Sequence, residues 1–439
     1  MAGRMIGGSV SDKESEMKME KKKRKKFTFI DLFAGCGGLT EGFLQSKRFK
    51  ALAHIEWEWP MVETLRNRLV QKWGYSERMA ARDVVHFDIQ KTDELLNGHW
   101  SEDSIKKYGA TNHKYVIDGG LRKIVGARNV DLIIGGPPCQ AYSIHGRAQD
   151  KDSMQNDYRN YLFESFVKVV DAFRPKVFVF ENVTGMLSAK PGGVHVTERI
   201  YDAFANIGYD IRRPNELPSA VFDAVDFQVP QFRRRVIILG IRRGSGFDLD
   251  DLYAAISRER SKKPYKTVRD AIGNLPRILP LDKPIKGRRA NISHEVVQTD
   301  FVVEQHLPRY HAPREVGIFR DWIVKDMNHA SHQEQVEYYY KATGHTTLYT
   351  KYKNLTWNNP AHTVVAHLSK DGMMFIHPDS EQARSITIRE AALLMTFPVD
   401  FRFYGSNPYC FKMIGNAVPV NLAKGIAKGL AKELERETK

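Results

Sequence analysis

Cys139 lies in the segment whose residue types point most directly to chemistry, Gly135-Gly-Pro-Pro-Cys-Gln-Ala-Tyr-Ser143. The segment follows an apolar run, Val130–Ile134, which predicts a buried strand. Because prolines fix the backbone and glycines let it turn without a clash, the thiol would be held at the carboxyl end of that strand. Open α/β sheets bind their ligands at this end. The pattern therefore favours a nucleophilic cysteine, and the alternative is a small buried hydrophobic residue.

Two further polar segments adjoin predicted strands and could assist such a thiol. Glu181–Val183, with the sequence Glu-Asn-Val, ends an apolar run, and Gln231–Arg235 precedes another apolar run at Val236–Leu239. A carboxyl group in a dry pocket can stay protonated near neutrality, and a guanidinium can stabilise negative charge that develops on a ring. These residue types fit a proton donor and a charge-stabilising group beside a nucleophile.

A glycine-rich turn, Asp31–Gly38, lies between a predicted strand and a predicted helix, where glycines let a ligand approach the backbone. Glu56 stands eighteen residues after Gly38, at the end of the next predicted strand. This spacing suits a carboxylate that accepts hydrogen bonds from ribose hydroxyls. Trp57 follows and could lie flat against an adenine ring or pack in the core. Nicotinamide cofactors fit the same geometry, so the spacing alone leaves the cofactor open.

The elements that must position these residues alternate between strands and helices from Phe27 to about Gly240, which predicts a doubly wound sheet of parallel strands. The predicted strands are Phe27–Phe33, Lys50–Ile55, Val130–Ile134, Lys176–Phe180 and Val236–Ile241, and the predicted helices are Leu39–Gln45, Met61–Trp73, Asn160–Phe173 and Val196–Ile207. A stripe at Leu422, Ile426, Leu430 and Leu434 predicts a last helix that packs back onto this first domain. The polar stretch 90–128 predicts a surface helix pair without an assigned function.

These segments, with Ile414–Pro419 (Ile-Gly-Asn-Ala-Val-Pro) near the end of the chain, resemble the DNA (cytosine-5)-methyltransferases of the bacterial type. The resemblance covers nearly the whole chain, in the order that this family shows. It implies an α/β fold, a Rossmann-like doubly wound mixed sheet with a second, smaller target-recognition domain. It also implies S-adenosylmethionine as the cofactor and a specific short sequence of double-stranded DNA as the substrate.

The chemistry that the resemblance implies begins with the thiolate of Cys139, which adds to carbon 6 of a cytosine and makes carbon 5 able to attack a methyl sulfonium. Loss of the carbon 5 proton and elimination of the thiolate then restore the ring. The target base must first be flipped out of the duplex. By the resemblance, Glu181 protonates N3, Arg233 contacts O2 of the base, and Asn182 and Arg235 support the site. Gln231 belongs to the catalytic set as the first residue of the Gln-x-Arg-x-Arg signature that Arg233 and Arg235 complete.

The resemblance also implies the residues of two binding sites. The cofactor site comprises Phe33, Gly35, Cys36, Gly38, Glu56, Trp57, Asp88, Ile89, Pro138, Leu162, Asn416 and Val418. For DNA binding we expect Ser143, Arg147 and Gln149 in a loop that closes on the duplex, and Lys351, Lys353 and Asn354 among the residues that read bases.

Composition and charge set limits on the class of protein. The chain has 439 residues and a net charge of +15, which favours a polyanionic partner, although a merely soluble basic protein would also carry such a charge. Three cysteines without a Cys-x-x-Cys pair indicate neither a disulfide framework nor structural zinc, and we expect no metal. The chain has no apolar run of about eighteen residues, so no membrane span is expected.

We expect a monomer in the bacterial cytoplasm, on the nucleoid when bound to DNA, and consider a cognate restriction endonuclease as a partner. The predicted domains are a basic tail at 1–26, a catalytic domain at 27–243 and 384–439, and a target-recognition domain at 244–383. The basic run Lys21–Lys26 could be a nuclear localisation signal or a DNA-binding arm, or a disordered, solvated tail.

Three alternatives stay open at this point. A tRNA cytosine-5 methyltransferase shares the catalytic motifs, but the recognition stretch of about 140 residues favours DNA, since RNA-directed relatives keep a small one. An inactive DNA-binding relative is opposed by the presence of Cys139, Glu181 and Arg233. A nicotinamide oxidoreductase is the third.

Overall fold

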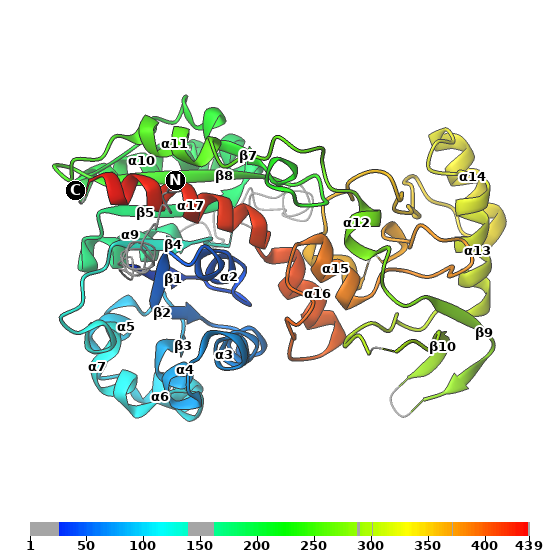
Figure 1. Ribbon diagram of the computed structural model, residues 1–439, viewed down its shortest axis with the longest axis horizontal. Helices are drawn as coiled ribbons and strands as arrows, with labels where there is room; N and C mark the ends of the chain where they lie inside the picture. The colour runs from blue at the N-terminus through cyan, green and yellow to red at the C-terminus, as the bar shows by residue number, and fades with distance from the viewer. Residues whose placement is uncertain (1–25, 139–161, 288–289, 301, 371, 438–439) are drawn as a thin grey trace, which may run out of the picture.

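The computed structural model describes residues 26–138, 162–287, 290–300, 302–370 and 372–437 (Figure 1). Cys139, Ser143, Arg147 and Gln149 lie outside the described residues, as do Asn160 and the tail as far as residue 25. The predictions made for them are therefore not compared with the structure.

An eight-stranded sheet forms the centre of the larger lobe, in the order β3-β2-β1-β4-β5-β8-β6, with β7 also paired to β8. Strands β3, β2, β1, β4 and β5 are parallel, whereas β8 runs antiparallel to β5, β6 and β7. The strands span Phe27–Leu32 (β1), Phe49–Glu56 (β2), Val84–His86 (β3), Leu132–Gly135 (β4), Val177–Val183 (β5), Tyr209–Ile211 (β6), Val221–Asp223 (β7) and Arg234–Arg242 (β8).

The predicted α/β fold class with a mixed sheet is thus confirmed, and the predicted strands agree with the observed ones within about three residues. The prediction of parallel strands from alternation alone is wrong for β8. An apolar run indicates that a strand is buried but not which way it runs, because its direction is set by the connection that precedes it.

Helices cover both faces of the sheet (Figure 1). The last helix, α17 (Val420–Arg436), packs on α2 (Gly38–Gln45) as predicted, so closely that a Cβ at Gly42 would collide with Ala423. The other helices of this lobe are α3 (Trp59–Trp73), α4 (Glu77–Asp83), α9 (Leu162–Phe173), α10 (Val196–Asn206) and α11 (Leu249–Ser257). None of the helices within the described residues is long and apolar enough to cross a membrane.

The stretch 90–128 forms α5 (Thr92–Asn97), α6 (Glu102–Tyr108) and α7 (Lys114–Val125), rather than the predicted pair of helices. It is joined to the sheet at β3, where Asn112 Oδ1 accepts a hydrogen bond from the backbone N–H of His86 at 3.0 Å. Because this stretch is polar overall, its sequence did not indicate the buried residues, such as Leu121 and Val116, that pack in the main core.

The smaller lobe contains a two-stranded sheet and several helices, which lie to the right in Figure 1. It has two hydrophobic cores within the described residues. One includes Trp322 and Phe319, and the other includes Phe397 and Ile414. Its elements are α12 (Val268–Ile272), β9 (Ile278–Lys286), β10 (Asn291–Val296), α13 (Pro313–Val324), α14 (His332–Thr343), α15 (Ile388–Leu394) and α16 (Asn407–Asn416).

Four buried histidines, His294, His306, His311 and His377, lie close to the buried ion pair between Arg384 and Glu390. Each of these imidazoles forms hydrogen bonds with neighbouring groups. His294, for example, donates to the carbonyl of Gln382 at 3.0 Å. Burial lowers the pKa of His294 to about 4 and that of His377 to about 3. Arg384 adds to both shifts, whereas Glu390 and Asp379 oppose the shift of His377.

This cluster predicts that its histidines lower the stability of the fold in acid. The unfolded chain binds protons at these histidines below about pH 6.5 while the folded chain does not, so their contribution to stability falls as the pH drops from 7 towards 5. The buried carboxyl groups of Asp31 and Glu56, whose pKa values are raised to about 7, act in the opposite direction over this range, so the test compares variants with the parent protein. In urea denaturation, the change in unfolding free energy from pH 7 to pH 5 should be more favourable in His377→Gln than in the parent by about 2 kcal/mol, and should be unaltered in the exposed His329→Gln. Equal pH dependence in all three proteins would contradict the assignment.

Candidate active site

The carboxyl ends of β4 and β5 bring two of the predicted segments together. A Cβ on Gly136, just after β4, would lie 2.6 Å from Glu181 Oε2, so the turn approaches this carboxylate more closely than a side chain would allow. Asn182 Nδ2 donates to the carbonyl oxygen of Pro137 at 3.3 Å. Asn182 therefore ties the end of β5 to the Pro-Pro turn, the segment that leads directly to Cys139.

Glu181 forms an ion pair with Arg235, whose Nε lies 2.8 Å from Glu181 Oε1. Both side chains are 11% exposed. Burial raises the pKa of Glu181, and the positive charges of Arg235 and Arg233 oppose that shift. A raised pKa favours a carboxyl group that can carry a proton to a ligand near neutral pH.

Arg233 is placed differently from the prediction, which had it contact the base. Its side chain is fully buried and donates to the backbone carbonyl oxygens of Val364 at 2.7 Å, Gly415 at 2.7 Å and Ala417 at 3.1 Å. Burial lowers the pKa of Arg233 well below its usual value, and the charge of Arg235 adds to the shift. These bonds occupy Nη1 and Nη2, whereas Nε has no hydrogen-bond partner within the described residues. The guanidinium that pairs with Glu181 belongs to Arg235, and this placement favours Arg235 over Arg233 for the contact with the base.

The exchange of roles has a simple cause in strand geometry. Successive side chains of a strand point to opposite faces, so Arg233 and Arg235 share a face and Arg234 points to solvent, where it is exposed. Sequence spacing predicts that shared face correctly but not which of the two side chains meets Glu181. The register of β8 on β5 decides it, with Arg235 opposite Val183.

Gln231 is fully buried and joins two distant segments. Its Oε1 accepts from the backbone N–H of Val364 at 2.9 Å, and its Nε2 donates to the carbonyl of Leu394 at 3.2 Å. Gln231 therefore fixes the backbone at Val364, which Arg233 also holds.

The glycine turn and Glu56 form one hydrogen-bonded unit. The carboxylate of Glu56 accepts from the backbone N–H groups of Gly35, Trp57 and Glu58, each at 2.9 Å. Burial raises the pKa of Glu56 to about 7, although these amides oppose the shift. Three residues of the turn have positive φ, Phe33 at 57°, Gly35 at 56° and Gly37 at 93°. A positive φ in a bulky residue such as Phe33 is backbone strain of the kind found at ligand sites.

The C-terminal motif, Ile414–Pro419, packs against this turn. A Cβ on Gly38 would lie 2.5 Å from the carbonyl oxygen of Val418, so Gly38 allows the two predicted cofactor segments to touch. Val418 is buried and Asn416 is exposed. The structure thus brings together residues that lie 380 positions apart in the sequence.

Trp57 is 44% exposed, which rules out simple core packing. Of the other predicted cofactor residues, Asp88 and Pro138 are half-buried, whereas Ile89 and Leu162 are buried. The thiol of Cys36 faces the carbonyl of Met413 at 3.8 Å, and burial raises its pKa. Only the backbone of Cys36 is therefore placed to contact a ligand.

Asp31 is a buried carboxylate that the prediction left out. Its Oδ2 accepts from Thr40 at 2.6 Å, and burial raises its pKa to about 7. Its Oδ1 has no hydrogen-bond partner among the residues that the structure describes. The signal was present in the sequence, since Asp31 opens the glycine turn, and an unpaired buried carboxylate oxygen there fits a ligand that carries a cation or a hydrogen-bond donor.

The residues predicted to read DNA bases lie in the smaller lobe. Lys351 and Lys353 are exposed. Asn354 is half-buried, and its Nδ2 donates to the carbonyl of Leu355 at 2.9 Å, so only part of its amide is free to contact a base.

The sequence pattern of the family described as C-5 cytosine-specific DNA methylase matches residues 27–432. The chain therefore belongs to this family of methyltransferase enzymes, and the predicted family, fold class and enzyme class, a DNA cytosine-5 methyltransferase, are confirmed. The match excludes the nicotinamide oxidoreductase alternative.

The chain is 34% identical to the type II methyltransferase M.Bpa9945I of Bacillus paralicheniformis, over 89% of this chain and 95% of that protein. It is 29% identical to the type II methyltransferase M.AgeI of Thalassovita gelatinovora, over 90% of this chain and 97% of that protein. Among solved structures, it resembles an E. coli prophage protein assigned as a DNA modification methyltransferase, with a TM-score of 0.56, 24% identity and coverage of 93% of this chain and 100% of that one. That likeness shows the shared fold.

The placement of Arg233 predicts that replacing this side chain destabilises the fold far more than replacing its neighbour Arg234. Arg233→Met leaves three buried carbonyl oxygens without a donor, so we expect the unfolding free energy to fall by about 2 to 4 kcal/mol. Arg234→Met removes an exposed side chain and should change stability by less than about 0.5 kcal/mol. Urea denaturation of both variants tests this, and equal losses would contradict the structural role of Arg233.

Proposed function

We propose that the protein transfers a methyl group from S-adenosylmethionine to carbon 5 of a cytosine flipped out of a specific short sequence in duplex DNA, through a covalent adduct between Cys139 and carbon 6. The Glu181–Arg235 ion pair carries this proposal, because it lies against Gly136 of the turn that leads to Cys139. A nucleophile, a proton donor and a cation next to each other are what addition to a pyrimidine ring requires.

In this proposal the thiolate of Cys139 attacks carbon 6 while Glu181 gives a proton to N3 of the ring. Arg235 stabilises negative charge on O2, the role first predicted for Arg233. Asn182 and Gln231 hold the backbone around these groups. After methylation the carbon 5 proton leaves, and the thiolate is eliminated as the ring regains aromaticity.

The residues present fit S-adenosylmethionine, which supplies an activated methyl group when bound. The Oδ1 of Asp31, which has no partner within the described residues, suits a cationic ligand. Gly38 has no room for a side chain, Gly35 has a positive φ, and Glu56 lies beside this turn to accept from ribose hydroxyls. The exposed ring of Trp57 is available to stack on adenine. We include in this site the remaining predicted residues: Phe33, the backbone of Cys36, Asp88, Ile89, Pro138, Leu162, Asn416 and Val418.

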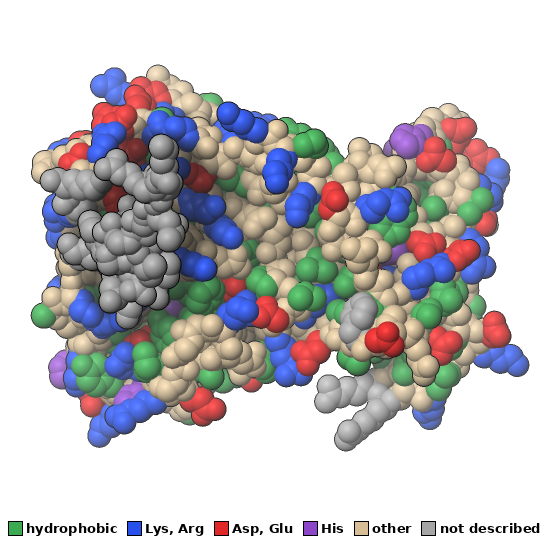
Figure 2. Space-filling model, in the orientation of Figure 1, with side chains coloured by type: hydrophobic (Ala, Val, Ile, Leu, Met, Phe, Trp, Pro, Cys, Tyr) green, Lys and Arg blue, Asp and Glu red, His purple; other side chains and the backbone are tan. Residues whose placement is uncertain are grey.

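Duplex DNA is proposed to lie between the two lobes. Figure 2 shows a hollow between them, with Lys and Arg side chains on both sides. Exposed Lys262, Lys263 and Lys266 lie on the connection from α11 to α12, which crosses from one lobe to the other (Figure 1). Such charge favours binding to phosphates. We propose that Lys351 and Lys353 read bases, that Ser143, Arg147 and Gln149 contact the duplex, and that catalysis and target recognition belong to residues 27–243 with 384–439 and to residues 244–383, respectively. These bounds divide the chain differently from the two lobes, because α11 lies on the larger lobe and α15 and α16 lie on the smaller one (Figure 1).

The two relatives described above are both named type II methyltransferases, so we further propose that this enzyme protects DNA from a cognate restriction endonuclease. We propose that it acts as a monomer.

Labelled S-adenosylmethionine tests the reaction itself. With duplex DNA and tRNA offered separately, we expect label in DNA cytosine only, and Cys139→Ser should abolish it because no adduct forms. A duplex with fluorine at carbon 5 of the target cytosine should remain covalently bound to Cys139, since fluorine cannot leave as a proton. Label in tRNA alone would favour the tRNA methyltransferase alternative, and no label in either would favour an inactive relative.

The exchange of the two arginines gives a second test. Arg235→Met should lower the methylation rate about a hundredfold or more while the fold persists, because a cation beside the developing charge is lost. Arg234→Met, on the opposite face of the same strand, is the matched control and should lose far less. A full rate in Arg235→Met, measured at saturating DNA and cofactor, would contradict the role given to Arg235.

A further inference from the structure

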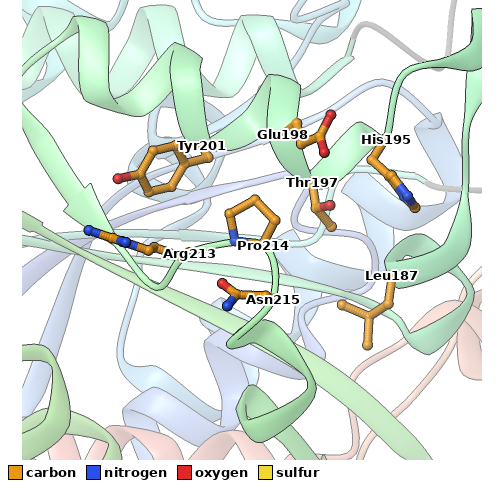
Figure 3. Close-up of a pocket in the computed structure, with 8 residues that line it drawn as sticks. All are labelled: Leu187, His195, Thr197, Glu198, Tyr201, Arg213, Pro214 and Asn215. Carbon is orange, nitrogen blue, oxygen red and sulfur yellow. The ribbon is translucent and has the colours of Figure 1, made fainter.

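The two edges of the central sheet, β6 and β3, differ in what they carry. Near β6, a surface hollow at the start of α10 is lined by exposed side chains such as Glu198, Arg213 and Asn215 (Figure 3). Water can satisfy polar groups of this kind, so these side chains indicate no ligand. At β3, the segment 90–128 forms hydrogen bonds that lead to the proposed cofactor site, and it has no assigned function.

His86, the last residue of β3, contacts the backbone of Trp57. Its Nε2 lies 2.9 Å from the carbonyl oxygen of Trp57, whose own N–H donates to Glu56 Oε1 at 2.9 Å. Both backbone polar groups of Trp57 are therefore held, while its ring stays exposed. His86 itself is buried, and its ring packs against those of Trp59 and Tyr108, with centroids 5.5 Å and 5.1 Å away.

The other ring nitrogen of His86 meets the segment 90–128. Nδ1 lies 2.7 Å from the hydroxyl oxygen of Thr111, between α6 and α7. Because a carbonyl oxygen only accepts, His86 donates to Trp57 from Nε2, and in the neutral ring Nδ1 then accepts from Thr111. Burial lowers the pKa of His86, although its bond to Trp57 opposes the shift, so the neutral ring dominates near pH 7.

Thr111 is itself held in place. Its carbonyl oxygen accepts from Nη1 of Arg66 at 2.7 Å, and Arg66 belongs to α3, the helix that begins two residues after Trp57. The side chain of the next residue, Asn112, accepts from the N–H of His86 at 3.0 Å and donates to the carbonyl of His86 at 2.8 Å. These bonds satisfy the free edge of β3 and fix where the Thr111 hydroxyl meets the imidazole.

The same segment holds the other predicted adenine contact, Asp88 with Ile89. Phe87, directly before them, stacks on Trp100 with the ring centroids 4.2 Å apart. The carbonyl oxygen of Ile89 accepts from the hydroxyl of Thr92 at 2.8 Å. Residues of the segment therefore hold both of the strand ends, those of β2 and β3, that are proposed to meet adenine.

We propose that Thr111 and His86 are positioning residues for the cofactor, and that the hydrogen bonds from Thr111 through His86 to the Trp57 carbonyl set how the indole meets adenine. Both act through Trp57 rather than through a contact of their own. The function of the segment 90–128 is then to hold the adenine end of the site. This inference rests on the proposed function, because it takes S-adenosylmethionine as the ligand beside Trp57.

Calorimetric titration of the full chain with S-adenosylhomocysteine tests this without turnover. Thr111→Val keeps the shape of the side chain and removes its hydroxyl, so we expect Kd to rise about fivefold, as for the loss of one hydrogen bond. Thr111→Ser keeps the hydroxyl and should bind within about twofold of the parent. Arg122→Met is the matched control and should bind as the parent does, because Arg122 only joins α7 to Asn97 of α5 within the same segment.

A double-mutant cycle separates action through Trp57 from a general loosening of the fold. With Trp57→Ala present, adding Thr111→Val should change Kd by less than about twofold, because the ring that Thr111 positions is gone. His86→Phe keeps a ring beside Trp59 and loses both hydrogen bonds, so it should weaken binding at least as much as Thr111→Val, and again only while Trp57 is present.

An unchanged Kd in Thr111→Val and His86→Phe would overturn the inference, and so would an equal effect of Thr111→Val with and without Trp57. If the parent protein does not bind S-adenosylhomocysteine, the proposed function fails together with this inference. If the parent binds it and both variants bind equally well, only the inference fails.

Discussion

The oppositely charged side chains of Glu181 and Arg235 lie 2.8 Å apart, near the end of β5 and the start of β8. Removing both from water is costly, and their contact offsets that cost only while the surrounding backbone holds them in register. The antiparallel pairing of β5 and β8 supplies that register, and Gly136 leaves the space that the carboxylate fills. The proposed chemistry depends on this constraint, because it positions a proton donor and a cation beside the turn that leads to the thiol.

The second requirement is that the end of the chain returns to the site. Arg233 donates to carbonyl oxygens of Val364, Gly415 and Ala417, so one buried guanidinium joins strand β8 to the smaller lobe and to the C-terminal motif. Val418 then lies against Gly38 of the cofactor turn. An arginine that looks catalytic in the sequence thus works as a connector, and its charge also acts on the pKa of Glu181.

The interior of the smaller lobe differs in composition from that of the larger lobe. Its described part contains one two-stranded sheet and short helices, and polar networks contribute much of its interior. The buried Arg384–Glu390 pair lies close to buried histidines whose pKa values burial lowers, whereas the core around β1 and β4 is largely aliphatic.

The sequence by itself determined the family and the fold class, because apolar runs, glycine turns and the Pro-Pro-Cys segment are local signals. It also indicated that Glu56 would lie beside the glycine turn and that α17 would pack onto the first lobe. Only the tertiary structure decided which arginine faces Glu181, that the thiol of Cys36 is turned into the core, and that Asp31 keeps an unpaired oxygen. These outcomes depend on strand register and on contacts between residues hundreds of positions apart, and the spacing of residues along a chain carries no information about them.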